Sequence, residues 1–214
     1  AVERVRNEDR QELTALPCNI HDEEAVADLA SAVVEQAGRI DLLVNNAGGQ
    51  FPAPAREISA KGWNAVLETN LTGAFYMCRA AFVASMERHG GAIVNITMDM
   101  YGGFPMMAHS GAARAGVENL TKSLAAEWAS SGVRVNSVAP GVIASSGLET
   151  YAPEFRKVVF SMKKHNPTYR LGTEAEVASG VVFLLSPGAG FLTGENLRID
   201  GGGSDIISGA LTNL

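Results

Sequence analysis

The sequence predicts an α/β protein, a doubly wound parallel sheet with helices on both faces. Short apolar runs without alternation, such as residues 42–44, are typical of strands that are buried on both faces of such a sheet. Segments with helical spacing follow these runs along the chain, and parallel neighbouring strands need such helical connections. The length of 214 residues suits one domain, which we assign to residues 1–214.

In the first half of the chain, capping residues help to place the helices. Asp22 precedes the first helix, where its carboxylate can accept hydrogen bonds from free backbone amides, and Gly38 ends that helix. Gly90 and Gly91 end the last helix of this half. We predict strands at residues 16–20, 40–44 and 92–97, and helices at residues 23–36, 61–68 and 72–88.

The second half continues the same alternation. Pro140 and Gly141 end its first strand, because proline cannot donate to a sheet. Residues 145–170 have weak periodicity and contain Pro153 and Pro167, so we expect a mobile substrate cap there. The remaining predicted elements are helices at residues 110–130 and 174–185, and strands at residues 134–138 and 196–199.

The composition argues against several classes of function. The formal net charge of −6 argues against a nucleic-acid partner. No apolar run approaches the roughly 18 residues that span a bilayer, and no signal peptide is visible, so we expect no membrane partner and a cytoplasmic location. The 2 cysteines and 4 histidines lack metal-ligand spacing, so we expect neither a metal site nor a disulfide.

The stretch Asn-Asn-Ala-Gly-Gly at residues 45–49 directly follows the apolar run of the second predicted strand. In an open α/β sheet, ligands bind outside the carboxyl ends of the strands. Small residues at that place let a ligand approach the backbone, and asparagine amides can tie neighbouring strand ends together. A strand followed by a plain glycine turn explains the same residues equally well.

Several motifs resemble those of the short-chain dehydrogenase/reductase family, and together they cover nearly the whole chain. The resemblance implies a Rossmann-like fold that binds a nicotinamide cofactor. The matching motifs are Asn-Asn-Ala-Gly at 45–48, Glu-Thr-Asn-Leu-Thr-Gly at 68–73, Val-Asn-Ile at 94–96, Pro-Gly-Val-Ile at 140–143, Thr-Gly at 193–194 and Asp-Gly-Gly at 200–202.

The resemblance also implies the residues that hold the cofactor, which we expect to be NADP, with NAD as the alternative. Asn19 and Ile20 resemble the family's adenine-contacting pair, and Arg114 would hold the ribose hydroxyls. Ser145 would hold the nicotinamide carboxamide. The implied cofactor-binding residues are Asn19, Ile20, Asn46, Ala47, Gly48, Ile96, Arg114, Pro140, Gly141, Val142, Ile143 and Ser145.

The N-terminus departs from the family. The family opens with a strand, a glycine-rich phosphate turn and a helix, and residues 1–20 contain no such turn. In this fold that strand lies in the middle of the sheet, so a chain without it would have unpaired strand edges. We therefore expect that the N-terminal strand–turn–helix unit is missing from this sequence, together with the segment that distinguishes NADP from NAD.

The family's catalytic Tyr-x-x-x-Lys pair is replaced here by Ser110 and Arg114, and its serine falls near Thr97 or Met98. Ketone reduction needs a proton donor at the carbonyl oxygen, and neither a serine nor an arginine is a suitable acid. Conjugate reduction of an enoyl thioester instead places negative charge on the thioester oxygen, where fixed donors suffice. The predicted catalytic residues are Asn70, Tyr101, Ser110 and Arg114. Tyr101 and Ser110 would be donors toward the thioester oxygen, and Asn70 would orient a water or the Arg114 region.

Residues 104–122 are similar to the peroxisomal trans-2-enoyl-CoA reductase branch, and the related 2,4-dienoyl-CoA reductases also lack the usual pair. The resemblance implies an NADPH-dependent enoyl-CoA reductase with an acyl-CoA substrate. That branch has a tyrosine where this chain has Glu118, and a structural pair of Glu118 with Arg114 is the alternative interpretation.

The cap is the expected substrate wall, although core and solvated surface are the alternatives. An acyl tunnel would be lined by Met106, Met107, Phe160 and Met162, and the CoA phosphates would meet Lys163, Lys164 and Arg170. Two other functions stay open: a catalytically impaired nucleotide-binding or regulatory protein, and a carbonyl reductase or dehydrogenase with Tyr101 as its acid. The family resemblance also implies a homodimer or homotetramer.

Overall fold

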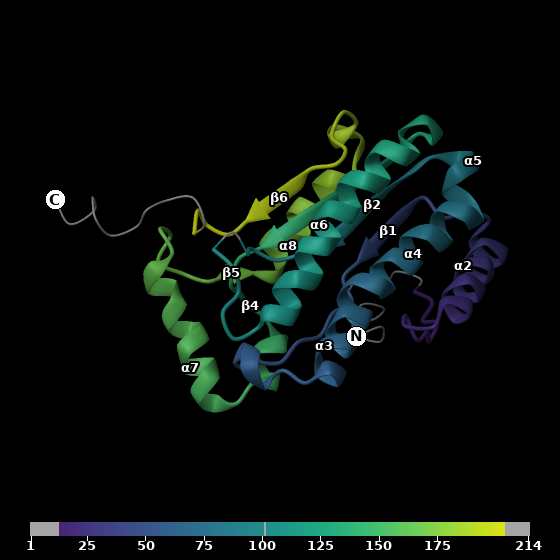
Figure 1. Ribbon diagram of the computed structural model, residues 1–214. Helices are drawn as coiled ribbons and strands as arrows, with labels where there is room; N and C mark the ends of the chain where they lie inside the picture. The colour runs from purple at the N-terminus through teal and green to yellow at the C-terminus, as the bar shows by residue number, and fades with distance from the viewer. Residues whose placement is uncertain (1–12, 101, 204–214) are drawn as a thin grey trace.

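The computed structural model describes residues 13–100 and 102–203, and they form a four-stranded parallel sheet with helices around it (Figure 1). The strands are β1 (Leu42–Asn45), β2 (Gly91–Ile96), β3 (Val133–Pro140) and β6 (Asn196–Ile199), in the order β1-β2-β3-β6. All neighbouring pairs are parallel, so the carboxyl ends of the strands meet at one edge of the sheet. The predicted α/β class is confirmed.

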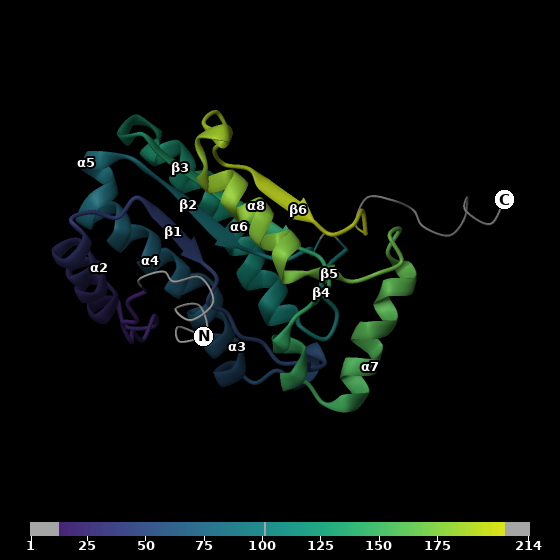
Figure 2. The ribbon, with the colours of Figure 1, turned by 180° about the vertical axis from the view of Figure 1, so that it is seen from behind.

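Helices cover both faces of the sheet (Figures 1 and 2). On one face α4 (Gly73–Ala81) and α6 (Ala108–Trp128) form a core cluster that includes Ile93 of β2. On the other face α8 (Glu174–Leu185) packs on Val94, the next residue of that strand. Successive strand residues thus face opposite layers, which explains apolar runs without alternation. No helix in the described ranges is long and apolar enough to cross a bilayer.

The helices predicted at residues 61–68 and 72–88 are one continuous helical run, so the prediction of two separate helices is wrong. The run contains α3 (Ala60–Leu67), a π-helical turn (Glu68–Thr72), α4, a second π-helical turn (Phe82–Met86) and α5 (Glu87–His89). The polar residues Thr69 and Asn70 interrupt the apolar pattern at the first turn, yet the chain passes it without leaving the helix. Such π turns occur frequently at functional sites.

The N-terminal region contains one predicted element and lacks another. Helix α2 (Glu23–Ala37) begins as expected, because Asp22 Oδ1 accepts hydrogen bonds from the amides of Glu24 and Ala25 at 3.0 and 3.2 Å. Residues 16–20, however, form no strand. A strand needs a paired neighbour, and in the part of the chain that the structure describes β1 is the outermost strand on that side, with Leu42 53% and Val44 41% exposed.

The cap is an excursion between two short paired strands, β4 (Ile143–Ala144) and β5 (Gly172–Thr173). It contains α7 (Pro153–Ser161), which begins at Pro153 because a proline needs no amide partner in the first turn. The return into α8 is closed by a reciprocal pair of hydrogen bonds between Thr173 and Glu176. The described single turns of 3₁₀ helix are Ala55–Glu57, Ala129–Ser131, Ser146–Thr150, Met162–His165 and Pro187–Ala189.

Candidate functional site

The strand ends pack closely enough to require a glycine. The amide of Gly141, just after β3, donates to the carbonyl of Ile199 at 3.0 Å. A Cβ atom on Gly141 would lie 2.8 Å from the Cα atom of Asp200. Only glycine therefore lets the two loops after β3 and β6 approach backbone to backbone. This places the predicted Pro140–Gly141 turn firmly at the carboxyl edge.

Asn70 fixes the glycine turn that follows β1. The residue lies in the π-helical turn between α3 and α4 and is 1% exposed. Its Nδ2 donates to the carbonyls of Gly49 at 2.7 Å and Val66 at 2.8 Å, and its Oδ1 accepts from the Gly49 amide at 3.3 Å. The amide thus holds the Gly49 backbone from both sides. Orientation of a water or of the Arg114 region by Asn70, its predicted role, stays a prediction.

Arg114 lies on α6, and its side chain reaches the glycine turn after β1. Its Nη1 donates to the carbonyl of Ile96, the last residue of β2, at 2.6 Å. A Cβ atom on Gly48 would collide with Nη2 of Arg114 and lie 2.8 Å from Asn70 Oδ1. The guanidinium therefore fills the space that glycine leaves open, between the ends of β1 and β2.

The charge of Arg114 has no carboxylate partner among the described residues. Glu118, the alternative partner considered from the sequence, pairs with Lys122 at 2.9 Å. Burial lowers the pKa of Arg114 to about 10, so the side chain is still a cation at neutral pH. A half-buried cation without a carboxylate partner in the described ranges costs some stability, and it favours a bound anion or developing negative charge.

Ser110 lies one helical turn before Arg114 and begins a chain of hydrogen bonds. Its buried Oγ donates to Gln50 Oε1 at 2.6 Å, and Gln50 Nε2 donates to the Tyr151 hydroxyl at 3.0 Å. Neither Gln50 nor Tyr151 is predicted from the sequence. Gln50 carried a signal, since it directly follows the glycine pair after a strand. Tyr151 carried none, because 101 residues separate it from Gln50.

His109, the residue before Ser110, fixes the backbone of Ser110 through a hydrogen bond. Its ring is fully buried and packs edge-on against Phe51, with the ring centroids 4.5 Å apart. Nδ1 accepts the backbone amide of Ser110 at 2.7 Å. This fixes a ring form with the proton on Nε2, which is the buried side-chain polar atom without a partner in the described part of the chain.

A second polar network connects β1, β2 and α6. Asn45 Nδ2 donates to Asn95 Oδ1 at 2.8 Å, and Asn95 Nδ2 donates to Thr121 Oγ1 at 3.0 Å. Thr121 Oγ1 in turn donates to the Val117 carbonyl at 2.8 Å. This polar ladder (Asn45, Asn95, Thr121) ties β1 to β2 and β2 to α6, as expected for asparagines at strand ends. Burial raises the pKa of the adjacent Cys78 thiol to about 12, so that thiol is inert.

Other predicted site residues have simpler surroundings. Asn19 is exposed, and its Oδ1 accepts from the amide of His21 at 3.2 Å. Ile20 packs against the start of α4, where a Cβ on Gly73 would lie 2.8 Å from Ile20 Cδ1. The buried Thr97 hydroxyl donates to the Val138 carbonyl at 3.0 Å. Asn46 and Ala47 are exposed after β1, Val142, Ile143 and Ser145 lead into the cap, and Tyr101 lies outside the described residues.

The cap residues only partly follow the expected arrangement. Met107 is buried, whereas Met106, Phe160 and Met162 are 44%, 46% and 45% exposed. Arg170 forms two hydrogen bonds with Glu176, at 2.9 and 2.6 Å, which lower the pKa of that carboxyl to about 2. Its guanidinium is therefore engaged by a carboxylate. Lys163 is exposed on the last turn of the cap, as is Lys164.

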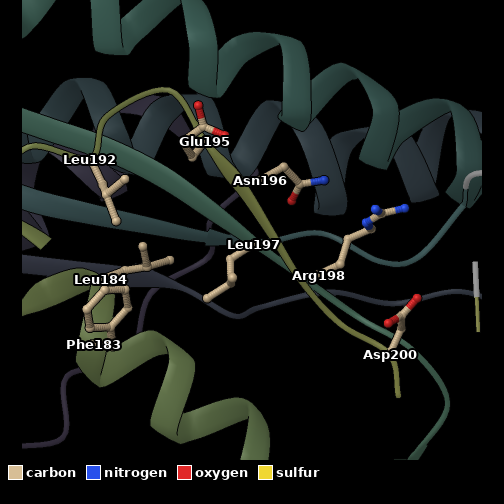
Figure 3. A pocket seen from close by; sticks show the side chains of 8 residues that line it. All are labelled: Phe183, Leu184, Leu192, Glu195, Asn196, Leu197, Arg198 and Asp200. Carbon is tan, nitrogen blue, oxygen red and sulfur yellow. The ribbon is translucent and has the colours of Figure 1, made fainter. Parts of the chain in front are cut away.

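Two cavities lie outside the Arg114 region. One, of about 470 Å³, runs along the outer edge of β6 and the end of α8 (Figure 3). The second, of about 230 Å³, lies between the cap and the end of β6 and is lined by Ile143, Asn166 and Gly201 among others. Neither cavity includes Arg114 or Ser110. The charged and hydrogen-bonded groups of the Arg114 region therefore lie outside both cavities.

Comparison with known proteins adds a family match and several relatives. Residues 1–204 match the family model described as enoyl-(acyl carrier protein) reductase. A Bacillus subtilis protein described as a probable 2,4-dienoyl-CoA reductase is 36% identical over 187 residues, which cover 86% of this chain and 74% of the relative. The 3-oxoacyl-acyl-carrier-protein reductase FabG of Vibrio cholerae is 36% identical over 189 residues, which cover 86% of this chain and 75% of FabG.

A solved structure is also similar to this one. The citronellol catabolism dehydrogenase AtuB of Pseudomonas aeruginosa superimposes with a TM-score of 0.82 at 47% identity. The match covers 93% of this chain and 77% of that structure. These proteins act on different substrates by their names, so the likeness defines the kind of chemistry more closely than it defines the substrate.

Proposed function

This chain belongs to the short-chain dehydrogenase/reductase family, and we propose that it reduces the carbon–carbon double bond of an enoyl-CoA thioester with NADPH. Membership of the family establishes an NAD(P)-dependent oxidoreductase. One observation carries the finer proposal: a half-buried cation, Arg114, and a buried hydroxyl, Ser110, stand where the family has its lysine and tyrosine. The likeness to a 2,4-dienoyl-CoA reductase supports the substrate class.

Arg114 suits the stabilisation of negative charge, and both Arg114 and Ser110 are poor acids. Reduction of a ketone ends with a proton on the carbonyl oxygen, and neither serine nor arginine readily supplies one. In conjugate reduction the electron pair of the double bond moves to the thioester oxygen, and the new proton goes to carbon, where water can deliver it. Arg114 then provides positive potential without losing a proton, in a site where fixed donors are effective.

The residues at the strand ends fit a nicotinamide dinucleotide. The Arg114 guanidinium lies against Gly48 and has no described carboxylate partner, so it is suited to ribose hydroxyls. Residues Pro140–Ile143 would face the nicotinamide, and Asn19 and Ile20 the adenine. When bound, the reduced cofactor supplies the hydride that adds to the β-carbon. NADP as the preferred form stays part of the proposal.

The cap would form the acyl side of the site. Phe160 and Met162 expose apolar side chains that suit a flexible acyl chain. Lys163 and Lys164 can meet the CoA phosphates, whereas Arg170 is already paired with Glu176. The expected homodimer or homotetramer stays a prediction, which sedimentation equilibrium would test.

A second candidate is a dehydrogenase for an apolar alcohol or aldehyde. The 47% identity with the citronellol catabolism dehydrogenase favours it over a catalytically impaired protein of the same fold. It requires an acid at the carbonyl oxygen, and Tyr101 is the sequence candidate for that role. A Tyr101→Phe variant should then lose nearly all activity.

Oxidation of NADPH, followed at about 340 nm with a series of trans-2-enoyl-CoA thioesters, tests the proposal. NADH is the cofactor control, and apolar alcohols with NADP⁺ or NAD⁺ are the substrate control. We expect turnover of thioesters and a preference for NADPH. Turnover of alcohols alone would replace the proposal with the second candidate, and cofactor binding without any turnover would indicate a catalytically impaired protein.

A further inference from the structure

The hydrogen-bond chain that begins at Ser110 ends in the cap, on the phenol of Tyr151. The two distances, 2.6 Å from Ser110 Oγ to Gln50 Oε1 and 3.0 Å from Gln50 Nε2 to the Tyr151 oxygen, join α6, the β1 loop and the cap. Ser110 occupies the position of the family's tyrosine. A tyrosine hydroxyl is therefore present at this site after all, but it comes from a different part of the chain and lies one amide group away.

The donor-to-acceptor direction of these hydrogen bonds determines what the Tyr151 hydroxyl can do. Ser110 donates to the amide oxygen of Gln50, so the amide nitrogen of Gln50 is the donor toward Tyr151. The phenol oxygen accepts that bond, which leaves its own proton available for a ligand. Hydrogen bonds in a chain polarise one another, so a phenol that accepts at its oxygen becomes a better donor.

The hydrogen-bond chain is held in place at both of its ends, Ser110 and Tyr151. Ser110 is fully buried, and its backbone amide is held by His109 Nδ1. Tyr151 is half-buried, and its ring packs edge-on against Phe155 with centroids 5.2 Å apart. The phenol is thereby held in place by contacts that do not use its proton. Such preorganisation makes a donor effective when charge develops nearby.

We infer that Tyr151 donates a hydrogen bond to the thioester oxygen of the bound substrate and that Gln50 is its positioning residue. The inference rests on the proposed function, whose substrate supplies that oxygen. Tyr151 keeps its proton throughout: hydride adds to the β-carbon, the electron pair moves to the oxygen that Tyr151 faces, and water protonates the α-carbon. The phenol thus replaces the hydrogen bond of the missing family tyrosine without replacing its acid function.

A chromophoric thioester tests this contact without relying on turnover. The absorption of para-dimethylaminocinnamoyl-CoA moves to longer wavelength when its thioester oxygen accepts hydrogen bonds. We expect the wild-type protein to produce this shift and Tyr151→Phe to lose most of it, because phenylalanine retains the ring contact with Phe155 but has no hydroxyl. Turnover of trans-2-enoyl-CoA should fall about 10- to 100-fold in the same variant. Tyr169→Phe is the matched control, since Tyr169 lies in the same segment and is 68% exposed.

Gln50→Glu provides a second variant of nearly unchanged shape. A carboxylate only accepts, so Tyr151 would turn its proton toward the new carboxylate and away from the substrate, and the spectral shift should be lost although the tyrosine is present. Retention of the shift in Tyr151→Phe, or its absence in the wild type, would overturn the inference. If the spectral shift depends on Tyr151 but the protein reduces no enoyl thioester, the contact between Tyr151 and the thioester oxygen is supported. The proposed function is then overturned instead.

Discussion

Two polar networks lie at the carboxyl edge of the same strands and differ in how completely they are paired. In the polar ladder, the amides of Asn45 and Asn95 and the hydroxyl of Thr121 form a continuous series of hydrogen bonds. Around Arg114, one guanidinium bond goes to a backbone carbonyl and the charge has no described carboxylate partner. Paired buried groups stabilise a unique packing, whereas an uncompensated charge opposes it.

The difference indicates that neighbouring polar residues have different roles, one structural and one at the candidate active site. The polar ladder holds β1, β2 and α6 in register, and its side chains have little capacity left for a ligand. The Arg114 region keeps a cation available at some cost to stability, which is typical of active sites. Substitutions in the two networks should therefore separate activity from stability.

The largest effect is expected for Arg114→Met. Loss of the cation should lower kcat/KM for enoyl-CoA by at least about 100-fold, as for other fixed groups that stabilise developing charge. Since burial lowers the pKa of Arg114 from 12.5 to about 10, the charged form opposes folding at every pH below about 10. The free energy of unfolding in urea should therefore stay equal or rise by about 1 kcal/mol. Arg88→Met, on an exposed helix face, should change neither quantity.

Asn95→Ala should lower the free energy of unfolding and leave the activity nearly unchanged. The substitution removes the buried amide that joins Asn45 Nδ2 to Thr121 Oγ1, so we expect a loss of about 2–3 kcal/mol in the free energy of unfolding. Activity per folded molecule should stay within about threefold. Asn119→Ala on the exposed side of α6 is the matched control. A stability change as small as that of the control would remove the distinction between the two networks.

Gly48→Ala should act through Arg114. The added methyl group would occupy the position of Nη2, and the guanidinium, as the end of a flexible side chain, would have to move. We expect about a 10-fold loss in kcat/KM with little change in stability. In the double variant with Arg114→Met, the alanine should add almost nothing, because the group that it displaces is gone. Additive losses in this double-mutant cycle would contradict the link.

Thr121→Val should have the smallest effect. The shape of the side chain is preserved, but Asn95 Nδ2 loses its acceptor, so we expect about 1 kcal/mol of destabilisation in thermal or urea unfolding. Ser123→Ala, which removes an exposed hydroxyl from the same helix, should stay within about 0.5 kcal/mol of the wild type.

The sequence allowed prediction of the features that depend on local pattern. The parallel sheet, the Asp22 cap and the clustering of strand-end motifs all follow from periodicity and turn residues. Prediction failed at three features that the local pattern does not determine. Residues 16–20 have strand-like composition but no described partner strand. The π turn at Asn70 mimics a break between helices. The link from Gln50 to Tyr151 spans 101 residues and depends on how the cap folds back.

The central claim is that hydride reaches the β-carbon of an enoyl thioester, and the position of an isotope label tests it most directly. The protein would be given NADPH deuterated at the transferable hydride, together with an enoyl-CoA and an α,β-unsaturated aldehyde of the same chain length. Mass spectrometry and NMR of the products locate the deuterium. The account predicts deuterium on the β-carbon of a saturated acyl-CoA. Deuterium on the carbonyl carbon of an unsaturated alcohol, with the thioester unchanged, would contradict it.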